Sequence, residues 1–334
     1  MSEKGFRMPP EWAPHARTWM AWPSSGYTLG DDPDEARRTW AAVASAIVAF
    51  EPVTMVVDPG AVEVAGRHLD PRVEVVQAPL NDAWMRDIGP TFVLDGSGGL
   101  AAVDWVFNGW GGQEWAAWEH DAQIARFVAG RAGVPVVDSP LVNEGGGLHV
   151  DGAGTVLVTR TVQLDPGRNP DWDEARVEAE LERTLGARRV IWLERGLTRD
   201  YDEFGTRGHV DIVATFSAPG TVLVHRQDDR DHPDHEVSRG VADQLRAEGL
   251  TVIEVPAPRF THDEHGPVDY SYINHSLVNG GVVLCAFGEE AADTRAAAIM
   301  AEAYPGRRIE LVDARPLFAR GGGIHCITQQ EPAV

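Results

Sequence analysis

The chain has 334 residues, of which 43% are hydrophobic and 24% charged, so it is long and apolar enough to fold around a substantial core and is not a disordered chain. Its net charge of −22 disfavours nucleic acid as a partner, because phosphates must be neutralised by basic groups, and suits a small cationic substrate. The single lysine, Lys4, argues against a P-loop or a Schiff-base mechanism.

The first residues lack the apolar stretch of a secretory signal, and the sequence has no apolar run long enough to cross a bilayer. We therefore expect a cytoplasmic protein without a membrane partner. The two cysteines, Cys285 and Cys326, lie in unlike surroundings, which argues against a disulfide framework.

A short unit recurs along the chain: an acid or amide, then a turn, then an apolar strand. The residues that begin the four units are Asp87, Asp151, Asp211 and Asn274, spaced 64, 60 and 63 residues apart. The apolar runs that follow them are residues 89–94, 154–158, 220–224 and 280–284. Such a fixed period indicates a repeat architecture.

Helical periodicity follows each unit and ends at glycine or proline, and a Val/Ile-rich strand comes next. The predicted helices are residues 115–132, 173–185, 237–248 and 291–304. The predicted strands after them are residues 134–137, 189–193, 250–255 and 308–312. The unit is thus strand, strand, helix, strand, about sixty residues long.

Five such units would fill the chain if the two ends together supply the fifth. We therefore predict an α/β fold, a closed five-bladed ββαβ propeller forming a single domain over residues 1–334, because closure leaves no unpaired sheet edge. A doubly wound sheet is the alternative, but the early strand–GxGxxG–helix unit that would favour it is missing.

Cys326 is the leading candidate for a nucleophile. It follows three glycines and a histidine, a setting in which we expect an exposed, poised thiol. Cys285 lies in the apolar run 282–287 and is expected to be ordinary strand core.

His209-Val210-Asp211 has period-two spacing, which on a strand would point both polar side chains toward one face. We expect that face to line a polar cavity, although a hydrogen-bonded structural pair is the alternative. His149-Val150-Asp151 repeats the pattern, and only one of the two pairs need be catalytic.

Two further segments carry acids. Glu144 precedes three glycines and is expected at the mouth of a site, or else in solvent. In the segment 84–90, Asp87 could hold a cation and Trp84 could cover an alkyl chain; the alternative pairs Asp87 with an arginine and buries Trp84 in the core.

Metal binding is a weaker interpretation. The acidic and histidine-rich run 228–236 is expected to be a solvated turn between a strand and a helix. A zinc site from His149, His209, Asp211 and Cys326 fits by ligand type but lacks any short CxxC or HExxH pairing. We expect neither a metal nor a cofactor.

Together, four segments resemble the agmatine deiminase family, which includes the Porphyromonas-type peptidylarginine deiminases. They are residues 84–90, 144–146, 209–211 and 322–330. Residues 8–12 and 19–23 are similar to the amino-terminal signature of the family, so the resemblance runs nearly end to end.

The resemblance implies a five-bladed propeller and a deiminase that needs no cofactor. It also suggests that the protein forms a homodimer. It implies that Cys326 is the nucleophile and His209 the general acid and base. Asp87 and Asp211 would hold the guanidinium. Glu144 would orient the histidine or a substrate nitrogen, and Trp84 would line the alkyl chain.

Two positions depart from the family: Gly323 stands where asparagine is common, and Arg320 stands where glycine is common. Both could reshape the part of the site that binds the far end of the substrate, so Gly323 is grouped with the substrate-binding residues. The leading prediction is hydrolysis of agmatine to N-carbamoylputrescine and ammonia, in polyamine synthesis. The alternatives are deimination of peptidylarginine or another guanidine, and a non-catalytic guanidine-binding propeller.

Overall fold

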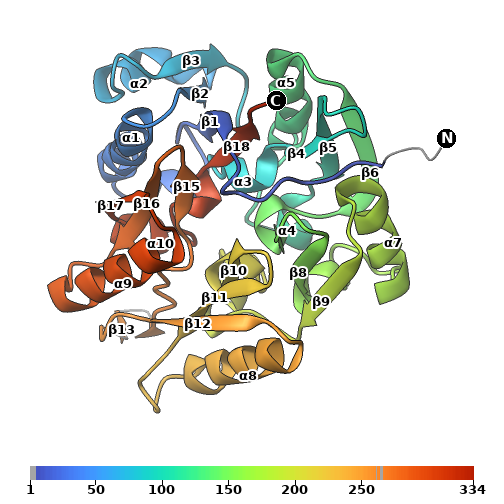
Figure 1. Ribbon diagram of the computed structural model, residues 1–334. Coiled ribbons are helices and arrows are strands. Elements are labelled where there is room, and N and C mark those ends of the chain that lie inside the picture. Colours follow the sequence, from blue (N-terminus) through green and yellow to red (C-terminus); the bar gives the residue numbers. More distant parts are fainter. Residues whose placement is uncertain (1–4, 261, 264–265) are drawn as a thin grey trace.

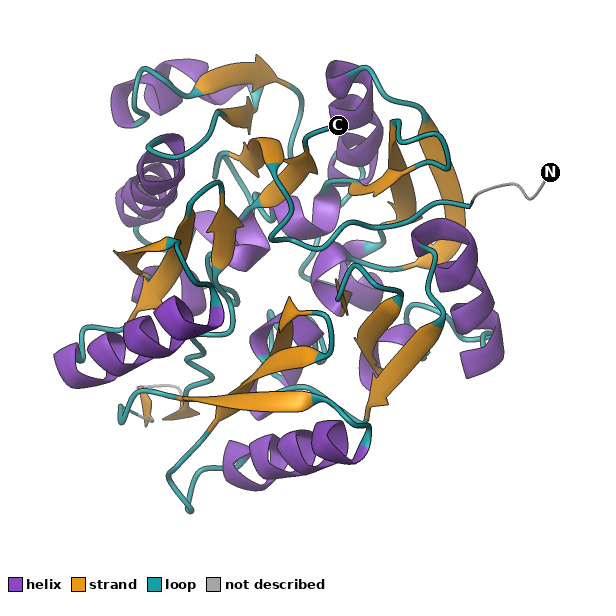
Figure 2. Ribbon diagram, viewed as in Figure 1, coloured by secondary structure: helices purple, strands orange, loops and turns teal. Residues whose placement is uncertain are grey.

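The strands of the chain form several small sheets rather than one large sheet. The computed structural model describes residues 5–260, 262–263 and 266–334. Within these residues, five sheets of three or four strands and one two-stranded ribbon make up a single α/β domain. The sheets surround a common centre, and most of the longer helices lie on the outside (Figures 1 and 2).

Four of the sheets are consecutive along the chain and share one design. They are β4(Thr91–Leu94)-β5(Leu100–Val106)-β6(Val136–Val142), β7(Leu148–Val150)-β8(Thr155–Thr159)-β9(Arg189–Leu193), β10(Ala214–Ala218)-β11(Thr221–Arg226)-β12(Thr251–Pro256) and β15(Ser276–Val278)-β16(Gly281–Ala286)-β17(Arg308–Asp313). In each, the first two strands are antiparallel and the third is parallel to the middle strand.

The fifth sheet joins the two ends of the chain. Its strands, in order, are β18(Gln329–Pro332), β1(His15–Ala21), β2(Val53–Val57) and β3(Glu74–Gln77). β18 pairs antiparallel with β1, and β1 pairs parallel with β2. The ribbon β13(His262–Asp263)–β14(Gly266–Pro267) stands apart from these sheets.

Helices connect the parallel strands within the sheets. The described helices are α1(Pro33–Val48), α2(Val62–His68), α3(Met85–Ile88), α4(Gly109–Gly112), α5(Ile124–Ala132), α6(Arg160–Gln163), α7(Glu174–Leu185), α8(Asp234–Ala247), α9(Glu290–Ala303) and α10(Arg315–Phe318). α7 begins at Asp173, whose side chain accepts from the amide of Arg176, and ends at Gly186 with φ 69°. No helix of the described residues is long and apolar enough to span a bilayer.

The middle strands are buried on both faces, between their helices and the neighbouring sheets. Val222, Leu223 and Val224 of β11 are fully buried, as are Val282, Val283, Leu284 and Cys285 of β16. A strand that is buried on both faces has a continuous apolar sequence, so the middle strands could be recognised as recurring apolar runs in the sequence. Cys285 is core, as predicted.

The predicted elements agree with the structure to within a few residues except in four places. Residues 115–132 are α-helical only from Ile124, after a 3-10 turn at Asp121–Gln123, because the Asn81 side chain accepts from the amides of His120 and Asp121 and holds the preceding segment in another path. The strand predicted at 134–137 extends to Val142 as β6. In the first unit, residues 91–94 form the first strand of their sheet, whereas the corresponding runs of the other units form the middle strand.

The strand predicted for His209-Val210-Asp211 is also wrong. Residues Val210–Ile212 form a 3-10 turn that begins at His209. The Asp200 carboxylate accepts from the amides of Gly208 at 2.7 Å and His209 at 3.0 Å, and these bonds turn the chain away from extended geometry.

Candidate active site

Cys326 lies on a 3-10 turn, His325–Ile327, immediately before β18. It is buried, with 7% of its surface exposed, so the expectation of an exposed thiol is wrong. Asn274 Nδ2 lies 3.2 Å from Sγ, and Asp211 Oδ2 lies 3.6 Å from it. Burial, together with the charges of Asp211 and Asp87, raises the pKa of this thiol well above its usual range.

Asp211 faces the thiol from the turn that begins at His209. Its Oδ2 accepts from His325 Nδ1 at 2.8 Å. Burial alone would raise the pKa of Asp211, but the His325 bond and charge lower it. Its Oδ1 is buried and has no hydrogen-bond partner among the described residues. A buried carboxylate oxygen without a donor indicates that a ligand supplies one.

Asp87 approaches the same point from α3. Its carboxylate accepts from Trp110 Nε1 at 2.9 Å and from the amide of Gly146 at 3.1 Å. Burial is the main reason that the pKa of Asp87 is raised to about 6, and the charge of Glu144 adds to it, while His209 opposes the rise.

Gly146 marks the point where these groups converge. A Cβ added there would lie 2.5 Å from His209 Nδ1 and 3.1 Å from both Asp211 Oδ2 and Asp87 Oδ1. Only glycine fits such a position without moving its neighbours. Asp87, His209 and Asp211, which lie far apart in the sequence from Gly146, therefore meet at one spot beside it.

The His209 ring lies between the carboxylates of Glu144 and Asp87. Its Nε2 lies 3.0 Å from Glu144 Oε2, and its Nδ1 lies 3.9 Å from Asp87 Oδ1. Burial alone would lower the pKa of His209, but the Asp87 charge and the Glu144 bond raise it to about 9. The ring is therefore an imidazolium at neutral pH.

Glu144 is fully buried, so the prediction that it lies at the mouth of the site is wrong. Its oxygens accept from Arg168 Nε at 3.0 and 3.1 Å, and Arg168 Nη1 binds Asp165 at 2.7 Å. Burial would raise the pKa of Glu144, but Arg168 and His209 lower it to about 2.

Trp84 and Gly322 border the thiol on another side. A Cβ at Gly322 would lie 2.6 Å from the Trp84 ring and 3.1 Å from Cys326 Sγ. Trp84 also packs edge-on against Trp40, so it belongs to the core and to the border of the site at once. At Gly323, a Cβ would collide with Asn274 Oδ1 at 2.4 Å, so the Asn274 side chain fills this space.

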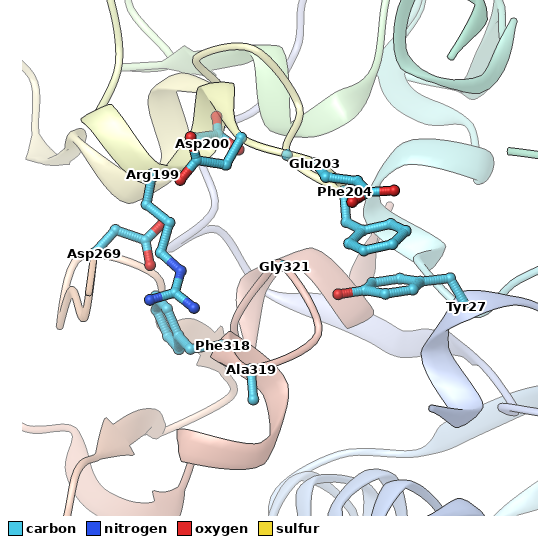
Figure 3. A pocket seen from close by; sticks show the side chains of 11 residues that line it. Tyr27, Arg199, Asp200, Glu203, Phe204, Asp269, Phe318, Ala319 and Gly321 are labelled. Carbon is cyan, nitrogen blue, oxygen red and sulfur yellow. The ribbon is translucent and has the colours of Figure 1, made fainter. Parts of the chain in front are cut away.

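A cavity of about 380 Å³ lies next to the glycines that precede the thiol (Figure 3). Its lining is mainly acidic and aromatic. It includes Tyr27, Arg199, Asp200, Asp202, Glu203, Phe204, Asp269, Phe318 and Gly321. Tyr27 and Phe204 stack with ring centroids 3.7 Å apart on one side of it. Arg199 lines the same cavity and pairs with Asp263 at 2.8 Å. The Asp200 carboxylate accepts from the amides of Thr206, Gly208 and His209, so Asp202, Glu203 and Asp269 are the lining acids that face a ligand.

In the described residues, the alternative zinc set of His149, His209, Asp211 and Cys326 does not form one group of potential ligand atoms. His149 lies apart from His209 and instead binds Thr215 Oγ1 at 2.6 Å. In the described part of the chain, the one group of three potential metal ligands comprises Glu11, His149 and His325, with ligand atoms within 4.8 Å of one another. In the run 228–236, residues 228–233 form the turn between β11 and α8, whereas residues 234–236 belong to α8. His232 and Asp234 are buried, so the expectation of a solvated turn is correct only in part.

Several site residues were not assigned from the sequence. Asn274 holds the thiol, and its place as the fourth member of the repeat series was a usable signal. Trp110 has φ 56° between two glycines, which is uncommon for a tryptophan and brings its indole to Asp87. Arg168 carried no local signal, because only tertiary contacts define its role. Glu11 lies in the segment 8–12 that resembles the amino-terminal signature of the family, but no role was assigned to it from the sequence.

Comparisons with known proteins agree with the geometry. The model of the Porphyromonas-type peptidyl-arginine deiminase family matches residues 7–332. A Streptomyces coelicolor protein named "Putative agmatine deiminase" is 60% identical over 98% of this chain and 99% of its own. The agmatine deiminase of Stutzerimonas stutzeri is 38% identical over 99% of this chain and 96% of its own.

A solved structure has the same fold. The agmatine deiminase of Enterococcus faecalis superposes with a TM-score of 0.91 at 32% sequence identity, covering 98% of this chain and 96% of that chain.

Proposed function

Because this chain belongs to the Porphyromonas-type peptidyl-arginine deiminase family, we propose that it is an agmatine deiminase. It hydrolyses a C–N bond of agmatine to give N-carbamoylputrescine and ammonia, through an amidino-cysteine intermediate. The observation that carries this proposal is the buried pair Asp87 and Asp211 beside Cys326, with one oxygen of Asp211 lacking a donor.

Binding follows from the charges. A guanidinium is a flat cation with a fork of N–H donors that carboxylates match. Asp87 and Asp211 hold it so that its central carbon faces Sγ. The cation also offsets the two charges that raise the pKa of the Cys326 thiol, so the thiol releases its proton to solvent when the substrate binds. Asn274 Nδ2 then stabilises the thiolate.

The first half of the reaction forms a C–S bond. The thiolate attacks the guanidinium carbon and gives a tetrahedral adduct. His209, an imidazolium with a pKa of about 9, donates its proton to the leaving nitrogen, and the C–N bond breaks to release ammonia. Glu144, held by Arg168, keeps the imidazole in place.

The second half reverses the role of the histidine. Neutral His209 takes a proton from water, and the hydroxide attacks the amidino carbon. The C–S bond then breaks, and the ureido product leaves. Trp84 lines the path of the alkyl chain in this proposal, and Gly323 shapes the space beside it through Asn274.

The far end of the substrate distinguishes agmatine from its competitors. The cavity of Figure 3 offers Asp202, Glu203 and Asp269 to a primary ammonium and would repel the carboxylate of free arginine. Tyr27 and Phe204 stack on each other along one side of this cavity, and in this proposal they keep a peptide chain out. These features favour a small dication over peptidylarginine.

The remaining features of the proposal concern the whole protein. The five sheets are interpreted as the blades of a closed ββαβ propeller, and residues 1–334 as one guanidine-deiminase domain. We assign the enzyme to the cytoplasm, in polyamine synthesis, which agrees with two free, buried cysteines. It works without a cofactor, nucleic acid or membrane partner, and a homodimer is the expected assembly.

The test is turnover of agmatine, free arginine and an arginine peptide by the purified protein, followed as ammonia release. Agmatine should be the best substrate, and Cys326→Ser should lower its turnover by a factor on the order of 10⁴ or more. Intact mass should show an adduct on Cys326 with a slow haloamidine. Equal or greater turnover of the peptide would reject agmatine as the substrate. A Cys326→Ser variant with unchanged properties would instead favour the non-catalytic interpretation.

A further inference from the structure

One buried histidine links the amino-terminal segment to the turn that carries the thiol. His325 Nδ1 lies 2.8 Å from Asp211 Oδ2, and His325 Nε2 lies 2.9 Å from Glu11 Oε1. All three side chains are buried. Ionised carboxylates only accept hydrogen bonds, so both ring nitrogens donate and the ring is an imidazolium.

We propose that Glu11 is a positioning residue for the reaction: it holds His325 as an imidazolium, which fixes one oxygen of Asp211 and leaves the other for the substrate. The inference rests on the proposed function for the identity of that substrate. It also gives a role to the segment Met8–Trp12, which the sequence analysis singled out without assigning it one.

The effect on Asp211 follows from the geometry. The carboxylate has one oxygen bound to a fixed cation and one buried oxygen without a partner. It therefore presents a single, oriented acceptor to a guanidinium nitrogen. A neutral His325 could donate from only one nitrogen and would lose either the Asp211 or the Glu11 contact.

Other charged groups around His325 make Glu11 the group that balances them. Arg86 Nη1 lies 3.3 Å from Glu11 Oε1, and Arg86 Nε donates to the carbonyl of His325 at 3.3 Å. His149 Nε2 lies 3.7 Å from Glu11 Oε2. Without the Glu11 charge, Arg86 would oppose an imidazolium at position 325. Burial and Arg86 would lower the pKa of His325, but Glu11 and Asp211 raise it.

The decisive variant is Glu11→Gln, which keeps the shape of the side chain and removes its charge. We expect kcat/KM for agmatine to fall at least about tenfold, because Asp211 loses a fixed partner. The acid limb of the pH profile, which Asp87 sets in the wild type, should move to higher pH in this variant, because Asp211 next to a neutral ring gains a proton more readily and its protonation also weakens substrate binding. Nitrogen-15 NMR of the histidine rings, assigned with His325→Asn, should change from two protonated nitrogens to one at neutral pH.

Glu51→Gln is the matched control. Glu51 is a buried carboxylate bonded to a histidine, with His15 Nδ1 at 3.1 Å. Its oxygens also accept from the Thr18 hydroxyl and the Asn279 amide, so its partners are different from those of Asp211 and His325. The pH profile and the His325 NMR signals of the Glu51→Gln protein should equal those of the wild type. Glu11→Asp, which retains the charge, should retain the doubly protonated ring.

A folded Glu11→Gln protein with a wild-type pH profile and a doubly protonated His325 would overturn the inference. If Glu11→Gln does not fold, His325→Gln takes its place, since glutamine can donate to Asp211 without carrying charge; a wild-type acid limb in that variant would be equally contrary. If the wild type itself does not act on agmatine, the proposed function fails, and the ring signals still decide the protonation of His325.

Discussion

At the scale of single residues, the carboxylates of the site have different charges because their partners differ. Glu144 is bound by the guanidinium of Arg168, and its pKa falls to about 2. Asp87 is bound by the neutral donors Trp110 and Gly146, and burial raises its pKa to about 6. One acid is thus permanently ionised, and the other responds to pH near neutrality.

These values predict a bell-shaped pH profile of kcat/KM. Asp87 must be ionised to hold the guanidinium, so activity should fall as pH drops below about 6. His209 must be protonated to release ammonia, so activity should fall above about 9. Ammonia release at saturating and limiting agmatine measures both limbs.

The variant Trp110→Phe tests whether the ionisation of Asp87 sets the acid limb. It removes a donor that favours the ionised form of Asp87, so this limb should move to higher pH. A profile that is flat through the predicted acid limb, or a shift to lower pH in Trp110→Phe, would contradict the assignment.

At the scale of elements, the side of the cavity that Tyr27 forms depends on the hydrogen bonds that hold residues 26–32, the segment before α1. Arg320 Nε donates to the carbonyl of Thr28 at 2.8 Å, and its Nη1 binds Glu35 Oε2 at 2.9 Å. Gly26, with φ 75°, and Gly30, with φ 55°, allow the tight path between these bonds. Tyr27 is therefore fixed where it stacks on Phe204.

Arg320→Gly should loosen this segment. We expect a loss of about 2 kcal/mol or more in the free energy of unfolding, because several charge-assisted hydrogen bonds disappear. The ratio of peptide to agmatine turnover should rise roughly tenfold as Tyr27 moves away from Phe204. Thermal unfolding and the two-substrate assay measure these effects. Arg38→Ala is the control, because the Arg38 side chain is 62% exposed and its Nη2 lies 3.9 Å from Asp32 Oδ2. An unchanged ratio of peptide to agmatine turnover in Arg320→Gly would contradict the prediction.

Helices and strands with strong local signals were predictable from the sequence. β9 matches the predicted strand, and α7, α8 and α9 match their predicted helices to within a few residues, because apolar periodicity and terminal glycines are local properties. The failures at residues 115–123 and 209–211 have a common cause. Side chains from outside each segment bind backbone amides there and override local preference: Asn81 lies 39 residues before His120, and Asp200 lies 9 residues before His209.

At the scale of the whole molecule, the fifth sheet holds the architecture together, because β18 supplies the partner of β1. Removing residues 329–334 should therefore abolish cooperative unfolding of the whole protein rather than fray one edge. Urea unfolding followed by tryptophan fluorescence tests this, since Trp19 lies buried on β1. Removing only Val334, which is 78% exposed, should leave the transition unchanged. A truncated chain with a sharp, wild-type transition would be evidence against it.

The site was predictable only where chemistry has a local signature. The thiol after three glycines and the acids at repeated positions could be selected from the sequence. The partners that set their charges could not, since Arg168 reaches Glu144 and Glu11 reaches His325 only in the folded chain. The repeat could have drawn attention to Asn274, which begins the fourth unit as Asp87 and Asp211 begin theirs.

The buried arginines raise the question of self-modification. Of the 29 lysine and arginine residues, 28 are arginine, so the chain is rich in the functional group that its own sulfur would attack. Arg168 donates to Glu144, Asp165 and the carbonyl of Thr206, and Arg86 donates to Glu11, Gln329 and the carbonyl of His325. Each guanidinium is held on several sides and cannot turn its carbon toward Cys326, so the native fold protects these arginines from conversion to citrulline.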